Sequence, residues 1–268
     1  MTERLKRFLL PDLRWSQEIY AETIACYMTP ETRWLDAGCG HQLLAEGLEA
    51  IEDRLTGSVH LAVGVDLQFS GPGRRELPLR ACADLKQLPF PDGEFQLVSC
   101  NMVVEHLQEP AAALREMTRV LSPGGHLVIH TPNVHSYTIS VGRIAKAILP
   151  RAWIFRVIRW SELREPTDVF PTYYQANTMG KLRTLLREAG SCERSSHFLA
   201  VPQPIFRPFA PLALLELLLQ RVSLSYPFRF LRGVLLVVGQ KPAPRETDHC
   251  PSFLKDTLSR NAAGRTEN

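Results

Sequence analysis

The stretch Trp34-Leu35-Asp36-Ala37-Gly38-Cys39-Gly40 decides the fold of this 268-residue chain. Its apolar beginning predicts a buried strand over residues 33–37, and the closely spaced glycines predict a tight turn after that strand. Strand, glycine turn and helix form the first half of a βαβ unit, in which glycine lets main chain approach a ligand. The helical spacing that follows the turn is carried by Leu43, Leu44, Leu48 and Ile51.

A second apolar run, Val59 to Val65, ends at Asp66 and completes the βαβ unit. An acid at the end of this strand can accept hydrogen bonds from both ribose hydroxyls of a nucleotide cofactor. By itself the pattern fits several such cofactors. A dinucleotide site would place a third glycine where this chain has Leu43, so the sequence weakens an NAD interpretation.

The alternation of strands and helices continues along the chain. Pro110 begins one predicted helix, and Thr178 can cap another that ends before Gly190. Such alternation predicts an α/β fold with a doubly wound, mostly parallel sheet of about seven strands. Beyond the first βαβ unit, strands are predicted at residues 95–100, 126–130, 192–198 and 234–240.

Composition and charge exclude several classes of function. The chain has 31 Lys plus Arg against 28 Asp plus Glu, a formal net charge of +3, and we therefore expect no nucleic-acid partner. Six cysteines stand singly without a CxxC pair, which predicts a reducing compartment and no metal. No signal-peptide core or uninterrupted apolar span is present in the sequence, so we expect a cytoplasmic protein that could at most bind a membrane surface peripherally.

Several ordered motifs resemble those of class I S-adenosylmethionine-dependent methyltransferases, in particular small-molecule enzymes with a type 11-like domain. The likeness runs from about Glu31 to Pro132 and includes Leu121-Ser122-Pro123-Gly124-Gly125. It implies S-adenosyl-L-methionine as the cofactor, an antiparallel last strand, and an acid before the glycines that holds the amino end of the cofactor. The cofactor-binding residues that the resemblance implies are Asp36, Gly38, Gly40, Asp66, Leu67, Asp84, Leu85 and Asn101.

The resemblance also suggests how the chain is divided. We expect one methyltransferase domain over residues 1–240, followed by a disordered tail over 241–268. Residues 1–30 should carry a helix that covers the cofactor. Two stretches do not fit the strand–helix rhythm: a long connection at 133–177, interpreted as a lid, and an apolar helical insertion at 202–232.

Three histidines are candidates for a general base: His106, His130 and His135. All three are predicted just beyond strand ends, on the edge where such sheets bind ligands. A base is needed only if the acceptor is a hydroxyl or an acidic carbon, and His106 is the first choice. A packing role for His106 is an equally good interpretation. Tyrosines that could line an acceptor pocket are Tyr137, Tyr173 and Tyr174.

Residues 143–160 combine basic and apolar side chains without an intervening acid. This pattern is typical of helices that lie on anionic membranes, and it predicts a peripheral membrane contact or a lipid-linked acceptor. The simpler interpretation, which we favour, is a lid whose apolar face packs on the core.

The sequence therefore predicts methylation of a small-molecule acceptor, with lipid-like and glycosylated metabolites as candidates. The resembling group includes enzymes of quinone biosynthesis. Two alternatives stay open: an NAD-type oxidoreductase on the same fold, and a non-catalytic cofactor-binding or adaptor protein. The motifs indicate neither the methylated atom nor the oligomeric state.

Overall fold

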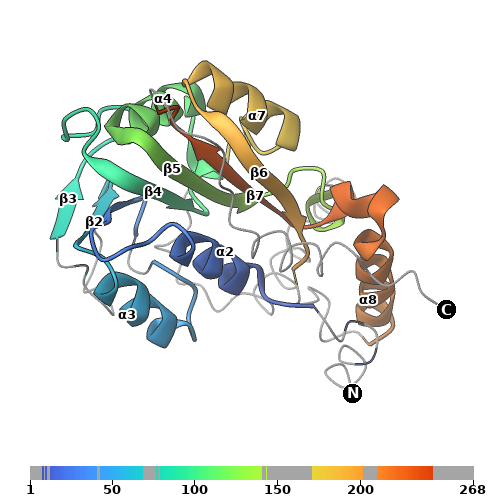
Figure 1. Ribbon diagram of the computed structural model, residues 1–268. Helices are drawn as coiled ribbons and strands as arrows, with labels where there is room; N and C mark the ends of the chain where they lie inside the picture. The colour runs from blue at the N-terminus through green and yellow to red at the C-terminus, as the bar shows by residue number, and fades with distance from the viewer. Residues whose placement is uncertain are drawn as a thin grey trace.

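A seven-stranded sheet with helices on both faces forms the computed structural model of this chain (Figure 1). This confirms the predicted doubly wound α/β fold class. The structure describes residues 8, 10, 13–40, 43–68, 77, 79–140, 143, 171–201 and 210–243.

The strand order in the sheet is β3-β2-β1-β4-β5-β7-β6. All neighbouring strands are parallel except β7, which is antiparallel to both β5 and β6, as the resemblance implied. From β1 the chain builds outward through β2 and β3, then returns to place β4 on the other side of β1. Ligands bind at such reversals, outside the carboxyl ends of the strands. The strands are β1 (Arg33–Ala37), β2 (Leu61–Asp66), β3 (Leu79–Cys82), β4 (Phe95–Asn101), β5 (Leu121–Pro132), β6 (Cys192–Leu199) and β7 (Val234–Gln240).

Helices cover the sheet on both sides, and each side has its own buried core (Figure 1). The core under α4 and α7 includes Leu114 and Leu182, whereas the core under α2 includes Ile19 and Ile24. Strands that are buried on both faces explain the nearly continuous apolar runs in the sequence. The helices are α2 (Ser16–Ala25), α3 (Glu49–Gly57), α4 (Pro110–Val120), α7 (Met179–Glu188) and α8 (Ala210–Leu224), with 3-10 turns η1 (Val104–His106) and η3 (Tyr226–Leu231).

The helix after the glycine turn begins later than its leucine spacing predicts. Leu43 and Leu44 precede α3 in irregular chain, although both are buried. Gly47 interrupts the segment with φ 94, and its N–H donates to Oε1 of Glu49, the first residue of α3, at 2.9 Å. The apolar spacing therefore indicated burial correctly and helix start incorrectly, because a left-handed glycine ends the periodic backbone.

Two further differences concern strands. The short strand β3 was not predicted, because it lies at the sheet edge, is only partly buried, and so lacks an apolar run. Strand β5 extends from Leu121 to Pro132, beyond the predicted 126–130. His130 therefore lies inside a strand and is fully buried, contrary to the prediction that it follows the strand end.

Candidate functional site

The glycine turn after β1 is held by the end of β2. The N–H groups of Gly38 and Cys39 both donate to the carbonyl oxygen of Val65, at 2.7 and 3.1 Å. Gly38 has φ 81, and a Cβ there would lie 2.3 Å from Cγ2 of Val103, so both conformation and packing require glycine. Gly40 has φ 50, and nothing lies within 4 Å of the place a Cβ would take. Packing thus fixes Gly38, while Gly40 leaves its surface open to a ligand.

Asp66 ends β2 beside this turn. Its Oδ2 accepts the N–H of Gly40 at 2.8 Å, and its Oδ1 accepts the N–H of Gln68 at 3.3 Å. The next residue, Leu67, is 66% exposed although it is apolar. An acid beside exposed apolar surface is the combination that a nucleoside needs, since the sugar offers hydroxyl donors and the base offers a flat apolar face.

Asp36 is a buried acid at the end of β1. The register of β1 and β4 pairs it with Ser99, whose Oγ donates to Asp36 Oδ1 at 2.5 Å and accepts from Trp34 Nε1 at 2.7 Å. Burial raises the pKa of Asp36 to about 7; the Ser99 hydrogen bond opposes this rise, and the charges of Glu52 and Asp66 add to it. A cation beside this carboxyl group would lower its pKa again. The site is therefore suited to a positively charged ligand group.

Asn101, at the end of β4, joins three elements. Its Nδ2 donates to Oε1 of Gln17 in α2 at 2.9 Å and to the carbonyl of Leu43 at 3.0 Å. Its Oδ1 accepts from Gln17 Nε2 at 3.2 Å and from Nδ1 of His130 in β5 at 2.8 Å. Helix α2 is thus fixed over the carboxyl ends of β4 and β5 by a side-chain amide pair.

The ring of His130 stacks on Tyr20 of α2, with centroids 5.1 Å apart. Burial lowers the pKa of His130 to about 3, so the ring is neutral. His130 Nε2 and Tyr20 Oη are both buried, and neither has a hydrogen-bond partner among the described residues. Because Nδ1 donates to Asn101, the first of these atoms is an acceptor. Buried polar atoms without partners indicate a polar ligand.

These residues fit S-adenosylmethionine. The acid at position 36 suits its ammonium group, the partnerless atoms of Tyr20 and His130 suit its polar amino-acid end, and Asp66 suits its ribose. The sequence did not single out Gln17, Tyr20 or Ser99, and it offered His130 only as a base. Nothing local marks these side chains, because strand register and helix docking bring them to the crevice.

Asp84 and Leu85 follow β3 at the neighbouring strand end. The Oδ1 of Asp84 accepts the N–H of Lys86 at 2.9 Å, and its carbonyl accepts the N–H of Gln87 at 2.8 Å. The acid therefore stabilises a turn, which is the simpler interpretation of an Asp at this place. Leu85 is buried in the core. Contact of either residue with a cofactor stays a prediction.

His106 lies in η1 beyond β4, where it meets the chain that follows the long connection. Its Nδ1 is 2.8 Å from the carbonyl oxygen of Pro171, and its Nε2 is 4.0 Å from Oε1 of Glu105. The carbonyl of Glu105 accepts the N–H groups of Tyr173 and Tyr174 at 2.7 and 3.1 Å. Since a carbonyl can only accept, Nδ1 carries the proton and Nε2 carries the lone pair. This arrangement can act as a base.

Buried polar side chains join η1 to β5 and to the residues that precede α7. Thr131 Oγ1 donates to Oε2 of the buried Glu105 at 2.9 Å and accepts from Nδ2 of Asn177 at 2.7 Å. Two non-glycine residues here adopt left-handed backbone, Met102 with φ 54 and Tyr174 with φ 52. Backbone in this region costs about 1–3 kcal/mol and is concentrated at functional sites. The carboxyl ends of β4 and β5 are therefore the candidate acceptor side.

The other predicted acceptor residues are dispersed. His135 is exposed beyond β5. Tyr137 instead turns toward α8, where its hydroxyl is 3.4 Å from Oε1 of Glu216 and accepts from Gln220 Nε2 at 2.9 Å. Tyr173 is 40% exposed, and its hydroxyl accepts from Nε2 of Gln108 at 2.6 Å. Of the proposed basic stretch 143–160, all but residue 143 lies outside the described residues, as do 244–268 of the tail.

The cysteines near the site are packing residues. Cys39 and Cys100 are buried, and burial raises the pKa of the Cys39 thiol to about 12. Burial also raises the pKa of Cys100 well above its usual value. Thiols in this state are poor nucleophiles. Within the described part of the chain, no cluster of three His, Cys, Asp or Glu side chains is placed to hold a metal ion.

Comparison with known proteins identifies the family to which this chain is similar. Residues 4–192 match a family described as "Methyltransferase domain". The chain is 30% identical over 105 residues to a ubiquinone biosynthesis O-methyltransferase of Marinobacter nauticus, covering 38% of this chain and 44% of the relative. It is 28% identical over 122 residues to a malonyl-[acyl-carrier protein] O-methyltransferase of Erwinia billingiae, covering 45% and 47%. The chain thus spans about half the length of these curated relatives.

A solved structure has the same fold over most of the chain. It is a chain of the complex between the Haloferax volcanii Trm112 methyltransferase activator and a methyltransferase, with TM-score 0.55 and 18% identity. The match covers 87% of this chain and 92% of that one. At this identity the likeness establishes the architecture of the sheet and its helices.

Proposed function

This chain belongs to the methyltransferase domain family, and from that premise we propose that it transfers the methyl group of S-adenosylmethionine to a small-molecule acceptor. The observation that carries the proposal is the meeting of Asp36, Asp66 and Asn101 at the point where the strand order reverses. Asp36 is a buried acid, Asp66 is suited to ribose hydroxyls, and Asn101 is hydrogen-bonded to His130, whose buried Nε2 has no partner among the described residues.

When bound, the cofactor supplies a methyl group made electrophilic by a positively charged sulfur. The chain's own residues then bind and orient. Asp36 would hold the ammonium group, Asp66 would accept hydrogen bonds from the ribose hydroxyls, and Leu67 would offer apolar surface to the adenine. The helix α2 excludes water through its Gln17–Asn101 pair and the stacking of Tyr20. Holding the reacting groups in line accounts for much of the catalysis in such a site.

The acceptor side is formed by η1 and the residues around 171–177. If the acceptor is a hydroxyl or an acidic carbon, His106 Nε2 takes its proton while Nδ1 remains bonded to Pro171. The carboxylate of Glu105, 4.0 Å away, stabilises the imidazolium that forms. The candidate acceptors are lipid-like and glycosylated metabolites. The names of the two relatives, one in ubiquinone biosynthesis and one acting on a carrier-bound malonyl group, support the first of these.

Calorimetric titration with S-adenosylmethionine, its demethylated product and NAD tests the cofactor. We expect heat with the first two and none with NAD. Asp66→Asn should weaken binding by about 10- to 100-fold, because hydrogen bonds to a charged group contribute about 1.5–3 kcal/mol. Asp92→Asn, a change at an exposed acid paired with Arg119, is the matched control and should bind normally. Folded protein that binds neither sulfur compound would overturn the proposal.

Transfer itself is tested with a cellular small-molecule extract and cofactor labelled in its methyl group. Label should appear in an extractable small molecule, and chromatography identifies its class. Binding without any transfer would favour the non-catalytic alternative instead.

A further inference from the structure

The helix α8 departs from the pattern of an ordinary surface helix, because it buries polar side chains beside the apolar Ala213 and Leu217. Its buried side carries three polar residues, Glu216 at 3% exposure and Gln220 and Ser223 at 1% each. Glu216 and Gln220 both contact the hydroxyl of Tyr137, at 3.4 and 2.9 Å. An amphipathic helix normally places its polar side chains in water and its apolar side chains inward.

The opposite side of α8 exposes large apolar residues at helical spacing. The stripe is between 38% and 53% exposed and consists of Leu214, Leu215, Leu218, Leu219 and Val222. The turn η3 follows directly and exposes three aromatic side chains, Tyr226, Phe228 and Phe230, at 69%, 44% and 48%. In Figure 1, α8 stands at one end of the molecule, away from the sheet. We call these eight residues the α8 apolar face. Contiguous exposed apolar surface of this kind marks an interaction site.

Within residues 210–243, the exposed charged side chains are all positive. Between residues 210 and 243, Glu216 is the only acid, and it is buried. Arg221 and Arg229 are exposed, and the Arg229 guanidinium lies 4.4 Å from the centroid of the Tyr226 ring. Arg232 ties the end of α8 to β6. Its guanidinium donates to the carbonyl oxygens of Ser223 and Leu224 at 2.9 and 2.7 Å, and to that of Phe198 in β6 at 3.0 Å.

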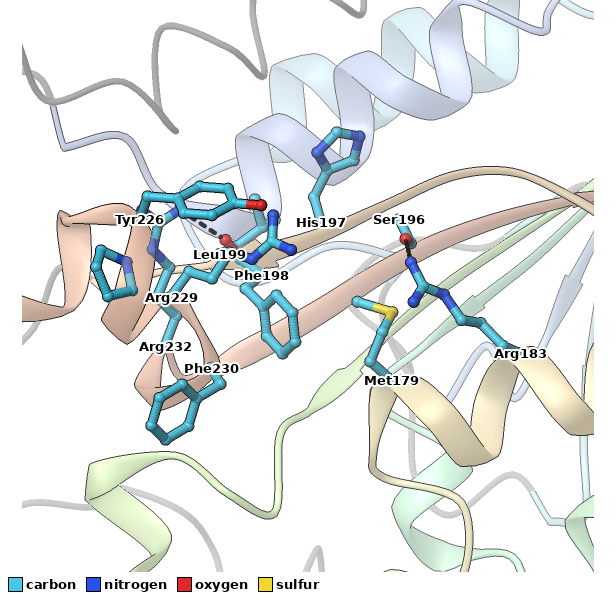
Figure 2. A pocket seen from close by; sticks show the side chains of 11 residues that line it. Met179, Arg183, Ser196, His197, Phe198, Leu199, Tyr226, Arg229, Phe230 and Arg232 are labelled. Atoms are coloured by element: carbon cyan, nitrogen blue, oxygen red, sulfur yellow. Dashed lines mark hydrogen bonds between the residues drawn. The ribbon is translucent and has the colours of Figure 1, made fainter.

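A cavity of about 490 Å³ opens beside η3, between β6 and α7 (Figure 2). Arg229, Arg232 and Arg183 line it together with aromatic side chains. Arg183 is paired with Glu193 at 2.8 Å, whereas neither Arg229 nor Arg232 has an ion-pair partner among the described residues. The cavity therefore offers positive charge next to the α8 apolar face, which is the arrangement that an anionic amphiphile requires.

We propose that the α8 apolar face docks on a membrane rich in anionic phospholipid, with the cavity beside η3 receiving a lipid phosphate. The leucine stripe would lie in the acyl boundary, the aromatic rings at headgroup level, and Arg221 and Arg229 against phosphates. Pairing with a second copy is disfavoured, because it would bring the Arg229 side chains of two copies together, and residues 210–243 contain no exposed acid to match them. None of the helices in the described ranges is long and apolar enough to cross a bilayer.

Vesicle flotation tests the docking with full-length protein. At low salt, we expect binding to phosphatidylcholine vesicles that contain phosphatidylglycerol and little binding to phosphatidylcholine alone. The double variant Leu215→Gln, Leu218→Gln should lower partitioning by about tenfold or more, since each change removes an inserted leucine. Leu79→Gln on β3 is the matched control, because that leucine is 52% exposed at the far edge of the sheet. Circular dichroism melting should show all variants folded.

Arg229→Gln tests the charged part and should lower binding to the anionic vesicles about fivefold. Its control is Arg187→Gln on the exposed side of α7, which should bind like the wild type. Absence of wild-type binding overturns the proposal. So does binding that the α8 double variant leaves unchanged, which would point to another segment such as 143–160. Sedimentation velocity tests the other occupant. If the wild type is a dimer that the double variant dissociates, and the wild type does not bind vesicles, the face contacts a second copy of the chain.

Discussion

Polar side chains are buried in two regions of the molecule, but in different ways. One region is the crevice at the ends of β1 and β4, and the other is the α8 apolar face. In the crevice, buried polar groups such as Asp36 and Asn101 converge on a space that suits one charged ligand. At α8, buried polar groups hold the helix in place and leave apolar groups outside. The difference teaches that burial of polar residues has two uses here, binding in one region and orientation of a surface in the other.

The largest expected difference between the two regions is the loss of unfolding free energy that a substitution causes. Gly38→Ala forces a Cβ to within 2.3 Å of Val103 Cγ2 at φ 81, so we expect a loss of about 3 kcal/mol in unfolding free energy. Leu215→Gln on the exposed stripe should change stability by less than about 0.5 kcal/mol. Urea denaturation measures both. Adding Val103→Ala should restore part of the loss in the Gly38 variant; no recovery would show that backbone strain alone is responsible.

Catalysis should depend on η1 and be independent of α8 in solution. His106→Ala should lower kcat about 100-fold with cofactor affinity unchanged, because a general base typically contributes at least that factor. The measurement is methyl transfer to the extract fraction that the wild type labels, alongside calorimetry with the cofactor. His135→Ala, at an exposed position, is the control. Unchanged turnover in the His106 variant would remove this residue from the mechanism.

The buried acid of the crevice should be visible in the pH dependence of stability. The pKa of Asp36 in the folded state is raised to about 7, so between about pH 4 and pH 7 the native state holds a proton that the unfolded state has lost. This contribution to stability is present at low pH and is lost as pH rises, by at most about 1.4 kcal/mol per unit.

Asp36→Asn isolates that contribution. Lowered pKa values of His126, His130 and His197 act with the opposite sign, since these rings favour folding at higher pH. The informative quantity is therefore the difference between wild type and variant in urea denaturation at pH 5 and pH 7. The wild type should lose more stability than the variant on going to pH 7. Parallel pH profiles would show that Asp36 does not titrate in this range.

The smallest expected effect concerns how α8 is held. Tyr137→Phe removes the hydroxyl that contacts Glu216 and Gln220, and we expect a loss of about 1 kcal/mol. Tyr173→Phe removes an exposed hydroxyl and should cost less. Thermal melting compares the two, and vesicle flotation of the first shows whether the orientation of α8 depends on this contact. Equal melting temperatures would mean that other contacts fix the helix.

The sequence by itself determined the central strands of the sheet and the glycine turn between them. Strand β1, the glycine turn and the acids at positions 36 and 66 follow from apolar runs and glycines, whose preferences depend on near neighbours in the chain. Thr178 likewise predicted the N-terminal cap of α7. The antiparallel direction of β7 came instead from the resemblance to the methyltransferase family.

Only the tertiary structure decided which distant side chains meet. Strand register brings Ser99 to Asp36 and His130 to Asn101, and the docking of α2 adds Gln17 and Tyr20; no local pattern contains these distances. The same holds for α8, whose composition predicts a helix but not its orientation. Its inward side carries Ala213 and Leu217 together with Glu216 and Gln220, and the last two contact a tyrosine some 80 positions away in sequence. No local pattern contains that contact, which satisfies polar groups that would otherwise be costly to bury.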